Sequence, residues 1–149
     1  MGTTRWLCID HGTARIGIAG GNSTTGIASP LEVIPAMPPE AAIERIKQVA
    51  QEYDAQGIVV GWPLNMDDSE GPQGQLARRM ARILVAATGL DVRLWDERLS
   101  SFTADQAIAG QYTRKKRKEH QDAVAAAVIL QDFFNNDGPS AAPRPQEIA

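Results

Sequence analysis

Residues 5–19 read RWLCIDHGTARIGIA, and this stretch carries the clearest fold signal in the chain. Arg5 to Ile9 form a short apolar run, residues 11–13 supply a turn that contains a glycine, and Arg15 to Ala19 resume an alternating pattern. Two extended runs joined by a glycine turn are typical of a β-hairpin. The sequence therefore predicts that the fold begins with two antiparallel strands.

Beyond the hairpin, the chain passes from strands to alternating helices and strands. Gly26 to Ile34 is a third extended stretch, and Pro30 within it favours an edge position. The further expected elements are a helix opened by Pro38-Pro39 and ending near Tyr53, a strand at 57–61, a helix at 72–88 capped by Gly89, a strand at 92–95, a weak helix at 103–109 and a helix at 119–134. This order predicts a mixed α/β domain over residues 1–134.

From Asn135 onward the composition changes to Asn, Pro, Ser and Ala. A segment of this composition has few side chains that could join a core. The sequence therefore predicts a disordered C-terminal tail over residues 135–149.

The overall composition excludes several classes of protein. The chain has 149 residues, of which 43% are hydrophobic and 22% charged, as in an ordinary globular domain. No apolar run approaches the ~20 residues that a membrane-spanning helix needs. The single cysteine, Cys8, can form neither an internal disulfide nor a cysteine zinc cluster, so we expect a soluble protein of the reducing cytoplasm with no membrane partner.

The net charge of −3 hides a segregation of basic residues. Residues 114–118 read RKKRK and hold five of the 15 Lys and Arg residues, while Arg78, Arg79 and Arg82 gather in a second place. A basic face, rather than a basic total, is what binds phosphates. The pattern indicates a nucleic-acid partner, and the alternative is a merely solvated surface.

Three carboxylates are distinguished by their positions. Asp10 ends the first predicted strand, Glu97 follows the last one, and Asp122 lies in the first turn of the final helix. Ligands of α/β sheets gather beyond the carboxyl ends of the strands, and the alanine-rich final helix can pack closely enough to add Asp122 to that edge. The alternative for each is local: a turn residue, an ion-pair partner for Arg98, and a helix N-terminal charge.

Three crowded carboxylates repel one another unless cations are present. Ligation by oxygen alone suits Mg²⁺ or Mn²⁺ rather than zinc. Two such ions ~3.5–4 Å apart activate a water and stabilise the leaving oxygen of a phosphodiester. We therefore expect a Mg²⁺ or Mn²⁺ site at Asp10, Glu97 and Asp122.

Other candidate residues allow weaker conclusions. The loop 61–71 is long enough to be functional, and within it Trp62 could stack on a base, although an anchoring role is favoured. His11 and His120 flank two of the carboxylates and receive no role. Cys8 lies inside a strand, so a structural thiol is expected.

Four segments together are similar to a known family. Residues 10–19 (DHGTARIGIA), 58–67 (IVVGWPLNMD), 95–100 (WDERLS) and 114–130 occur in the order found in the YqgF (RuvX-like) family of bacterial RNase H-fold proteins. The resemblance runs from about residue 5 to residue 134. Four motifs in order are far more specific than any one of them.

This resemblance implies an RNase H-like α/β fold: a mixed five-stranded sheet, its first three strands antiparallel, with helices on both faces. It also implies a divalent-metal nuclease in which Asp10, Glu97 and Asp122 are both catalytic residues and metal ligands, and in which a water attacks phosphorus to leave a 5′-phosphate. Family members are described as processing the 5′ end of pre-16S rRNA. The expected nucleic-acid contacts are Gly12, Thr13, Arg15, Asn65, Arg98, Arg114, Lys115, Lys116, Arg117 and Lys118.

The chain departs from the family pattern near the site. Ala14 stands where a lysine is common, so the grip on substrate is expected to depend more on Arg15 and residues 114–118. Other departures, such as Trp62 for a usual leucine, leave the three carboxylates untouched.

The main function expected is maturation of pre-16S rRNA, with structured RNA as the substrate. The alternative within the nuclease class is a Holliday junction resolvase acting on branched DNA, which needs paired cuts and hence a dimer; the sequence allows a monomer or a homodimer. A non-catalytic RNA-binding module remains a lesser alternative. A nucleotide-handling domain of the actin and sugar-kinase type, whose phosphate turn also begins Asp-x-Gly-Thr, is disfavoured because those proteins close two domains over ATP.

Overall fold

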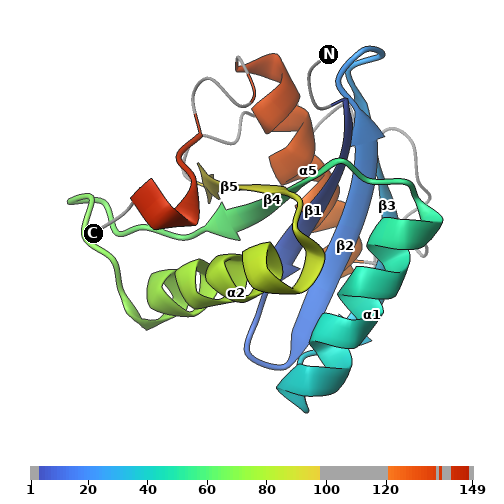
Figure 1. Cartoon of the computed structure of the whole chain (residues 1–149). Helices are drawn as coiled ribbons and strands as arrows, with labels where there is room; N and C mark the ends of the chain where they lie inside the picture. The colour runs from blue at the N-terminus through green and yellow to red at the C-terminus, as the bar shows by residue number, and fades with distance from the viewer. Residues whose placement is uncertain (1–3, 98–120, 137, 139–141, 148–149) are drawn as a thin grey trace.

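The computed structural model describes residues 4–97, 121–136, 138 and 142–147. Its strands form one five-stranded sheet in the order β3-β2-β1-β4-β5 (Figure 1). The elements in chain order are β1 (Arg5–His11), β2 (Arg15–Asn22), β3 (Ile27–Pro35), α1 (Pro39–Glu52), β4 (Gly57–Trp62), α2 (Pro72–Thr88), β5 (Asp91–Asp96), α5 (Gln121–Asn135) and the 3₁₀ turn η3 (Pro145–Glu147).

The sheet is mixed, as the sequence predicts. Strands β1, β2 and β3 pair antiparallel, whereas β4 pairs parallel with both β1 and β5. The third strand lies at the edge, where Pro30 is tolerated, and the pairing register with β2 shifts beside it, between Ile18 and Ala19. The predicted sheet composition is therefore confirmed.

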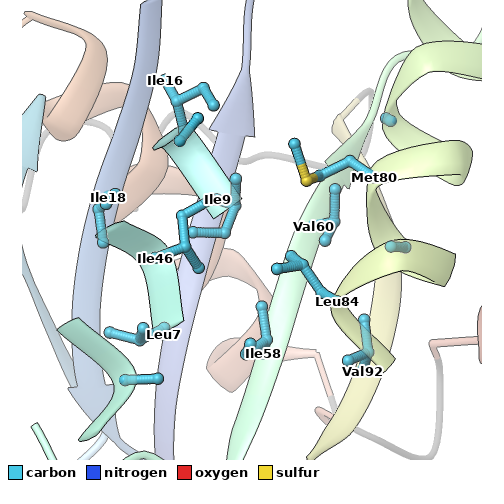
Figure 2. Close-up of a cluster of buried hydrophobic side chains, with 14 of the residues drawn as sticks. Leu7, Ile9, Ile16, Ile18, Ile46, Ile58, Val60, Met80, Leu84 and Val92 are labelled. Atoms are coloured by element: carbon cyan, nitrogen blue, oxygen red, sulfur yellow. The ribbon is translucent and has the colours of Figure 1, made fainter. Parts of the chain in front are cut away.

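Helices cover both faces of the sheet, which confirms that part of the prediction too. Helices α1 and α2 lie on one face and α5 lies on the other (Figure 1). Under α1 and α2, aliphatic side chains from the strands meet those of the helices, as Figure 2 shows for Ile9, Ile46, Val60 and Leu84. All four side chains are fully buried.

The core beneath α5 combines small helix residues with large aromatic ones. Ala126 and Ala127 are fully buried against the sheet, as the alanine-rich sequence predicts. Phe133 packs edge-on against Trp6 and Trp95, with ring centroids 4.9 and 5.6 Å away. The alanines bring the helix close, and the aromatic rings fill the space at its far end.

The predicted helices and strands agree with the structure to within a few residues. Helix α2 has the predicted bounds, and Gly89 ends it in the left-handed conformation with φ of 70°. Helix α1 begins at Pro39 and ends at Glu52, one residue before Tyr53. The weak helix expected at 103–109 and the first two residues of the helix expected at 119–134 lie outside the described residues.

The described residues of the predicted tail lie against the domain. The backbone N–H of Leu94 in β5 donates a hydrogen bond to the carbonyl of Pro143, at 2.9 Å. Ala142 is buried, and η3 packs against α2 and β5. The physical reason is the exposed edge of β5, which offers backbone groups that a polar segment can satisfy without a large apolar content.

Within the described parts of the chain, no helix has both the length and the apolar character that crossing a bilayer requires.

Candidate active site

Asp10 lies at the end of β1, on the face of the sheet that α5 covers. Along this strand, Trp6 and Cys8 belong to the core beneath α5, whereas Leu7 and Ile9 belong to the opposite core. Side chains alternate between the two faces of a strand, so Asp10 continues the row of Trp6 and Cys8. Asp10 thus places a carboxylate at the end of a row of otherwise apolar side chains.

Glu97 reaches the same place from β5. Trp95 belongs to the core beneath α5, and Glu97 follows it by two residues, directly after the strand ends at Asp96. The side chain of Glu97 is hydrogen-bonded to that of Asp10. The carboxyl ends of parallel strands meet at one edge of a sheet, and here that edge holds a carboxyl pair.

Burial governs the ionisation of this pair. Burial raises the pKa of Glu97 to about 7, and the negative charge of Asp10 and the hydrogen bond between the two groups contribute to the increase. Burial also raises the pKa of Asp10, whereas its hydrogen bond with Glu97 acts in the opposite direction. The neutral carboxyl of Glu97 is therefore the donor and the carboxylate of Asp10 the acceptor. Below a pH of about 7 the proton of this hydrogen bond therefore lies on Glu97.

Cys8 lies on β1, two residues before Asp10 and on the same face. Its thiol is fully buried, and burial, followed by the charges of Asp10 and Glu97, raises its pKa well above the ordinary value. A protonated, inaccessible thiol is not a nucleophile. The structure thus agrees with the structural role that the sequence predicts for Cys8.

A glycine in β4 leaves the space in which the two carboxyls meet. Gly61 lies on the strand between β1 and β5, in register with Trp95. A Cβ atom at Gly61 would lie 2.5 Å from Oε1 of Glu97 and 3.0 Å from Cδ1 of Ile129. The missing side chain therefore leaves room for Glu97 to cross β4 and reach Asp10.

A second glycine brings in the third carboxylate. Gly17 of β2 pairs with Asp10, and a Cβ atom at Gly17 would overlap the backbone carbonyl of Asp122. The described start of α5 thus lies directly on β2, and the negative charge of Asp122 contributes to the raised pKa of Asp10. Sequence reasoning missed both glycines, although a glycine inside a strand is a known sign that another group approaches closely.

Arg15 is bound to the third carboxylate. Its Nε lies 2.6 Å from Oδ2 of Asp122, although the side chain of Arg15 is 66% exposed and that of Asp122 is 32% exposed. One face of this arginine is therefore open to solvent while the other neutralises a carboxylate. The structure brings Asp10, Glu97, Asp122 and Arg15 together at one end of the sheet.

The turn between β1 and β2 lies beside this group. The N–H of Gly12 donates to the carbonyl of Arg15 at 3.0 Å, and a Cβ atom at Gly12 would lie 2.9 Å from that oxygen. Thr13 is exposed. The turn needs glycine at position 12 for its own closure, and it presents Thr13 to solvent next to Arg15.

The structure gives Asn65 and Trp62 roles within their own loop. Nδ2 of Asn65 donates to Oγ of Ser69 at 2.9 Å, and the backbones of these two residues are also hydrogen-bonded. Nε1 of Trp62 donates to Oε2 of Glu70 at 2.9 Å, and its ring packs on the core beneath α1 and α2. The anchoring role favoured for Trp62 is therefore confirmed.

Several predicted site residues lie outside the described part of the chain. These are Arg98 and the basic run Arg114, Lys115, Lys116, Arg117 and Lys118; His120, to which no role is assigned, also lies outside it. Their proposed contacts stay predictions.

His11 ends β1 on the opposite face from Asp10. Burial lowers the pKa of His11, against the opposing effect of a hydrogen bond with the backbone of Leu76. Its Nδ1 is buried and has no hydrogen-bond partner among the described residues.

The donor atoms of this site suit a hard divalent cation. The side chains of Asp10, Glu97 and Asp122 supply carboxylate oxygens alone, as Mg²⁺ and Mn²⁺ prefer. The described residues contain no set of three or more acidic, His or Cys side chains already arranged around one point. A proton joins Asp10 and Glu97, and Arg15 neutralises Asp122. The carboxylates therefore already have positive partners in the place where a cation would bind. The residues fit such an ion once that proton and Arg15 give way to it.

Known proteins of similar sequence cover almost the whole chain. The family model described as "RuvX: Holliday junction resolvase" matches residues 4–136. Proteins named "Putative pre-16S rRNA nuclease" are similar to it: that of Pelotomaculum thermopropionicum is 38% identical over 90% of this chain and 88% of its own, and that of Paracoccus denitrificans is 43% identical over 83% and 78%.

Solved structures share the fold at low sequence identity. The RuvC of T. thermophilus, solved in complex with a Holliday junction substrate, aligns with a TM-score of 0.60 at 14% identity, over 93% of this chain and 99% of that one. A second structure of Thermus thermophilus RuvC aligns with a TM-score of 0.54 at 16% identity, over 93% and 98%. The predicted RNase H-like fold is thereby confirmed. The match over residues 4–136, with relatives about 40% identical, shows that the chain belongs to the RuvX family.

Proposed function

We propose that this protein is a divalent-metal-dependent nuclease that hydrolyses phosphodiester bonds of RNA in the 5′-end maturation of pre-16S rRNA. The observation that carries the proposal is the hydrogen-bonded carboxyl pair of Asp10 and Glu97, with Asp122 beside it, at the carboxyl ends of β1 and β5. The names of the relatives support the choice of substrate. The lone, buried Cys8 supports a cytoplasmic location.

Asp10, Glu97 and Asp122 would hold Mg²⁺ or Mn²⁺ through their carboxylate oxygens. When bound, the ion supplies Lewis acidity, which lowers the pKa of water and stabilises charge on the leaving oxygen. Binding requires the proton that Glu97 donates to Asp10 to leave. Because burial holds that proton with a pKa of about 7, the site takes up a cation more readily as the pH rises through neutrality.

Arg15 binds the substrate at this site. A planar guanidinium can bind a phosphate through two hydrogen bonds, and most of the side chain of Arg15 is exposed for that purpose. Before a cation binds, its ion pair with Asp122 places the guanidinium beside the carboxylates. A cation on Asp122 would take over this contact and leave the guanidinium available for a phosphate. The residue therefore serves to hold a phosphate near the reacting bond, and the exposed turn at Thr13 is close enough to assist.

The second candidate is a Holliday junction resolvase. The description of the family and the likeness of the fold to RuvC favour it. Resolution requires two symmetric cuts and hence two sites in a dimer. RNA maturation requires one site, so the number of sites in the active species separates the two candidates.

A cleavage assay with paired substrates tests the proposal. The purified protein is incubated with Mn²⁺ or Mg²⁺ and either a 5′-extended pre-16S rRNA fragment or a four-way DNA junction. We expect cleavage of the RNA and a loss of about a hundredfold or more in Asp10→Asn and Glu97→Gln. Glu44→Gln, which changes an exposed carboxylate on α1, is the matched control and should cut at the wild-type rate.

The other outcomes point elsewhere. Paired nicks in the junction by a species of dimeric mass, without RNA cleavage, would establish the resolvase. RNA binding that persists in EDTA and in Glu97→Gln, with no cleavage by the wild type, would establish a non-catalytic RNA-binding module. Cleavage that survives Asp10→Asn would show that the reaction takes place at another site.

A further inference from the structure

A cavity lies on the other side of the sheet from the carboxylates, where β1 ends. Its volume is about 250 Å³, and it opens between the turn after β1 and the helices α1 and α2. His11, the residue next to Asp10, lines it together with the turn residues Gly12 and Thr13. The turn that flanks Arg15 in the candidate active site therefore also forms one wall of this cavity.

The remaining walls are mainly aliphatic, and they reach the surface. Met37 and Ile83 line the cavity and are 66% and 38% exposed, which is unusual for such large apolar side chains. Ile43 and Met80 line it from α1 and α2. Flexible methionines and branched aliphatic side chains suit a flat apolar ligand.

A few polar groups accompany the aliphatic walls. Nδ1 of His11 is buried without a hydrogen-bond partner among the described residues. Buried polar atoms are usually satisfied, so this unpaired nitrogen is unusual, although it is itself covered and lies behind the cavity wall. Thr13 adds an exposed hydroxyl group, and Arg79 adds a guanidinium. Aliphatic faces with a few hydrogen-bonding groups are typical of small-ligand cavities.

Positive charge adjoins this cavity along α2. Arg79 also lines a neighbouring cavity of about 190 Å³, together with Gln75, Arg78 and Arg82. Arg78 is ion-paired with Glu70 at 2.9 Å. The ligand that fits this surface is apolar at one point and anionic next to it.

We propose that the cavity binds one unpaired nucleobase of the nucleic-acid substrate, and that an adjacent phosphate of the same strand lies on Arg79 and Arg82. Bases combine a flat apolar face with a hydrogen-bonding edge, and they are attached to a phosphate backbone. The inference rests on the proposed function only for the identity of the ligand. The inference also predicts substrate selectivity: the protein binds a strand with an unpaired base near the scissile bond in preference to a continuous duplex.

The position of the cavity explains why this base is close to the cut. His11 and Asp10 are consecutive residues of one strand, and their side chains lie on opposite faces of the sheet. A strand that passes over the turn at residues 12–13 can therefore present a phosphate to Arg15 and an adjoining base to the cavity. Paired bases are held in a stack and cannot enter without being unpaired.

Binding measurements in the Asp10→Asn background test the proposal, because they need no cleavage. The probes are a short oligoribonucleotide carrying 2-aminopurine as a single unpaired base, and the same sequence fully paired. Met37→Ala and Ile83→Ala should each weaken binding of the unpaired probe about tenfold and leave binding of the duplex unchanged. Ile27→Ala, which removes a comparably exposed side chain on β3, is the matched control and should change neither.

Arg79→Ala tests the phosphate contact. It should make the slope of log affinity against log salt less negative by about 0.7 for the probe with the unpaired base. Equal losses for both probes in Met37→Ala and Ile83→Ala, or no loss in either, would overturn the proposal. If the wild type cuts no RNA, but Met37→Ala and Ile83→Ala weaken binding of the unpaired probe alone, the proposed function fails and this inference stands. If the wild type cuts RNA and both variants bind both probes as the wild type does, the proposed function stands and this inference fails.

Discussion

The carboxyl group of Glu97 donates a hydrogen bond to the carboxylate of Asp10, although the strands that carry them, β5 and β1, are separated in the sheet by β4. The contact crosses β4 at Gly61, where the missing side chain leaves room for Glu97. Two acids that repel each other when both are ionised are thus brought together by the fold, and one proton joins them while Glu97 is neutral. Their proximity is a property of the fold and is maintained at some cost in stability.

The first prediction concerns that cost. The folded state raises the pKa of Glu97 from 4.5 to about 7, so between these values it binds more protons than the unfolded chain does. Without divalent cations, the contribution of Glu97 to the free energy of unfolding should therefore be largest below about pH 4.5. This contribution should fall by about 2 kcal/mol as the pH rises through 7. Urea unfolding in EDTA at several pH values measures it.

Glu97→Gln supplies the control for this pH dependence. An amide keeps the shape and the hydrogen bond but does not titrate, so the fall in stability between pH 4.5 and 7 should shrink in this variant. The matched Glu44→Gln variant should retain it. A wild-type stability that rises over this pH range would contradict the assignment.

The second prediction concerns Gly61→Ala. The new Cβ would meet Oε1 of Glu97, the far end of a flexible side chain, so Glu97 should turn away while the fold persists. The pKa of Glu97 should then fall towards its ordinary value, and nuclease activity should drop about tenfold or more. NMR titration of the Glu97 carboxyl measures the first effect and the cleavage assay the second.

Gly71→Ala is the matched control for this substitution. A Cβ atom at Gly71 would meet its nearest neighbour, Nδ2 of Asn65, only at an ordinary contact distance of 3.6 Å. This variant should leave the titration of Glu97 unchanged. An unaltered Glu97 pKa in Gly61→Ala would show that the gap in β4 does not position the carboxyl.

The third prediction concerns Gly17→Ala, which should act on stability rather than on ionisation. Here the new Cβ would overlap backbone atoms of Asp122 and Ala123, which cannot rotate away as a side chain can. Helix α5 would have to move from β2, disrupting the core around Phe133. We expect a loss of about 3 kcal/mol or more, measured by urea unfolding. A loss below about 1 kcal/mol would mean that α5 shifts freely.

The fourth prediction concerns the C-terminal segment. Ending the chain after Asn136 removes the hydrogen bond from Leu94 to Pro143 and that from Nη1 of Arg93 to the carbonyl of Ala142, at 3.0 Å. Stability should fall by about 2 kcal/mol, because buried contacts are lost along with the hydrogen bonds. Hydrogen exchange should accelerate at the Leu94 amide and stay slow at Ile9 in the centre of the sheet. Unchanged exchange at Leu94 would show that the segment does not protect β5.

Much of the fold follows from local pattern. The hairpin at residues 5–19, the edge position of Pro30 and the bounds of α2 agree with the sequence analysis because side-chain periodicity and the backbone restrictions of proline and glycine act over a few residues. The tail shows the opposite case. Its composition is polar, yet Pro143 accepts a hydrogen bond from Leu94 at the edge of β5, and no local pattern in the sequence indicates this contact.

The sequence by itself determined which carboxylates stand at the ends of elements: Asp10 after an apolar strand, Glu97 after the last strand and Asp122 in the first turn of a helix. Only the tertiary structure decided how these residues meet, with one proton between Asp10 and Glu97 and with Arg15 on Asp122. The reason is that pairing register and helix docking join residues far apart in the chain. Gly17 and Gly61 read as ordinary strand glycines until the neighbouring α5 and Glu97 are seen in the space that their missing side chains leave.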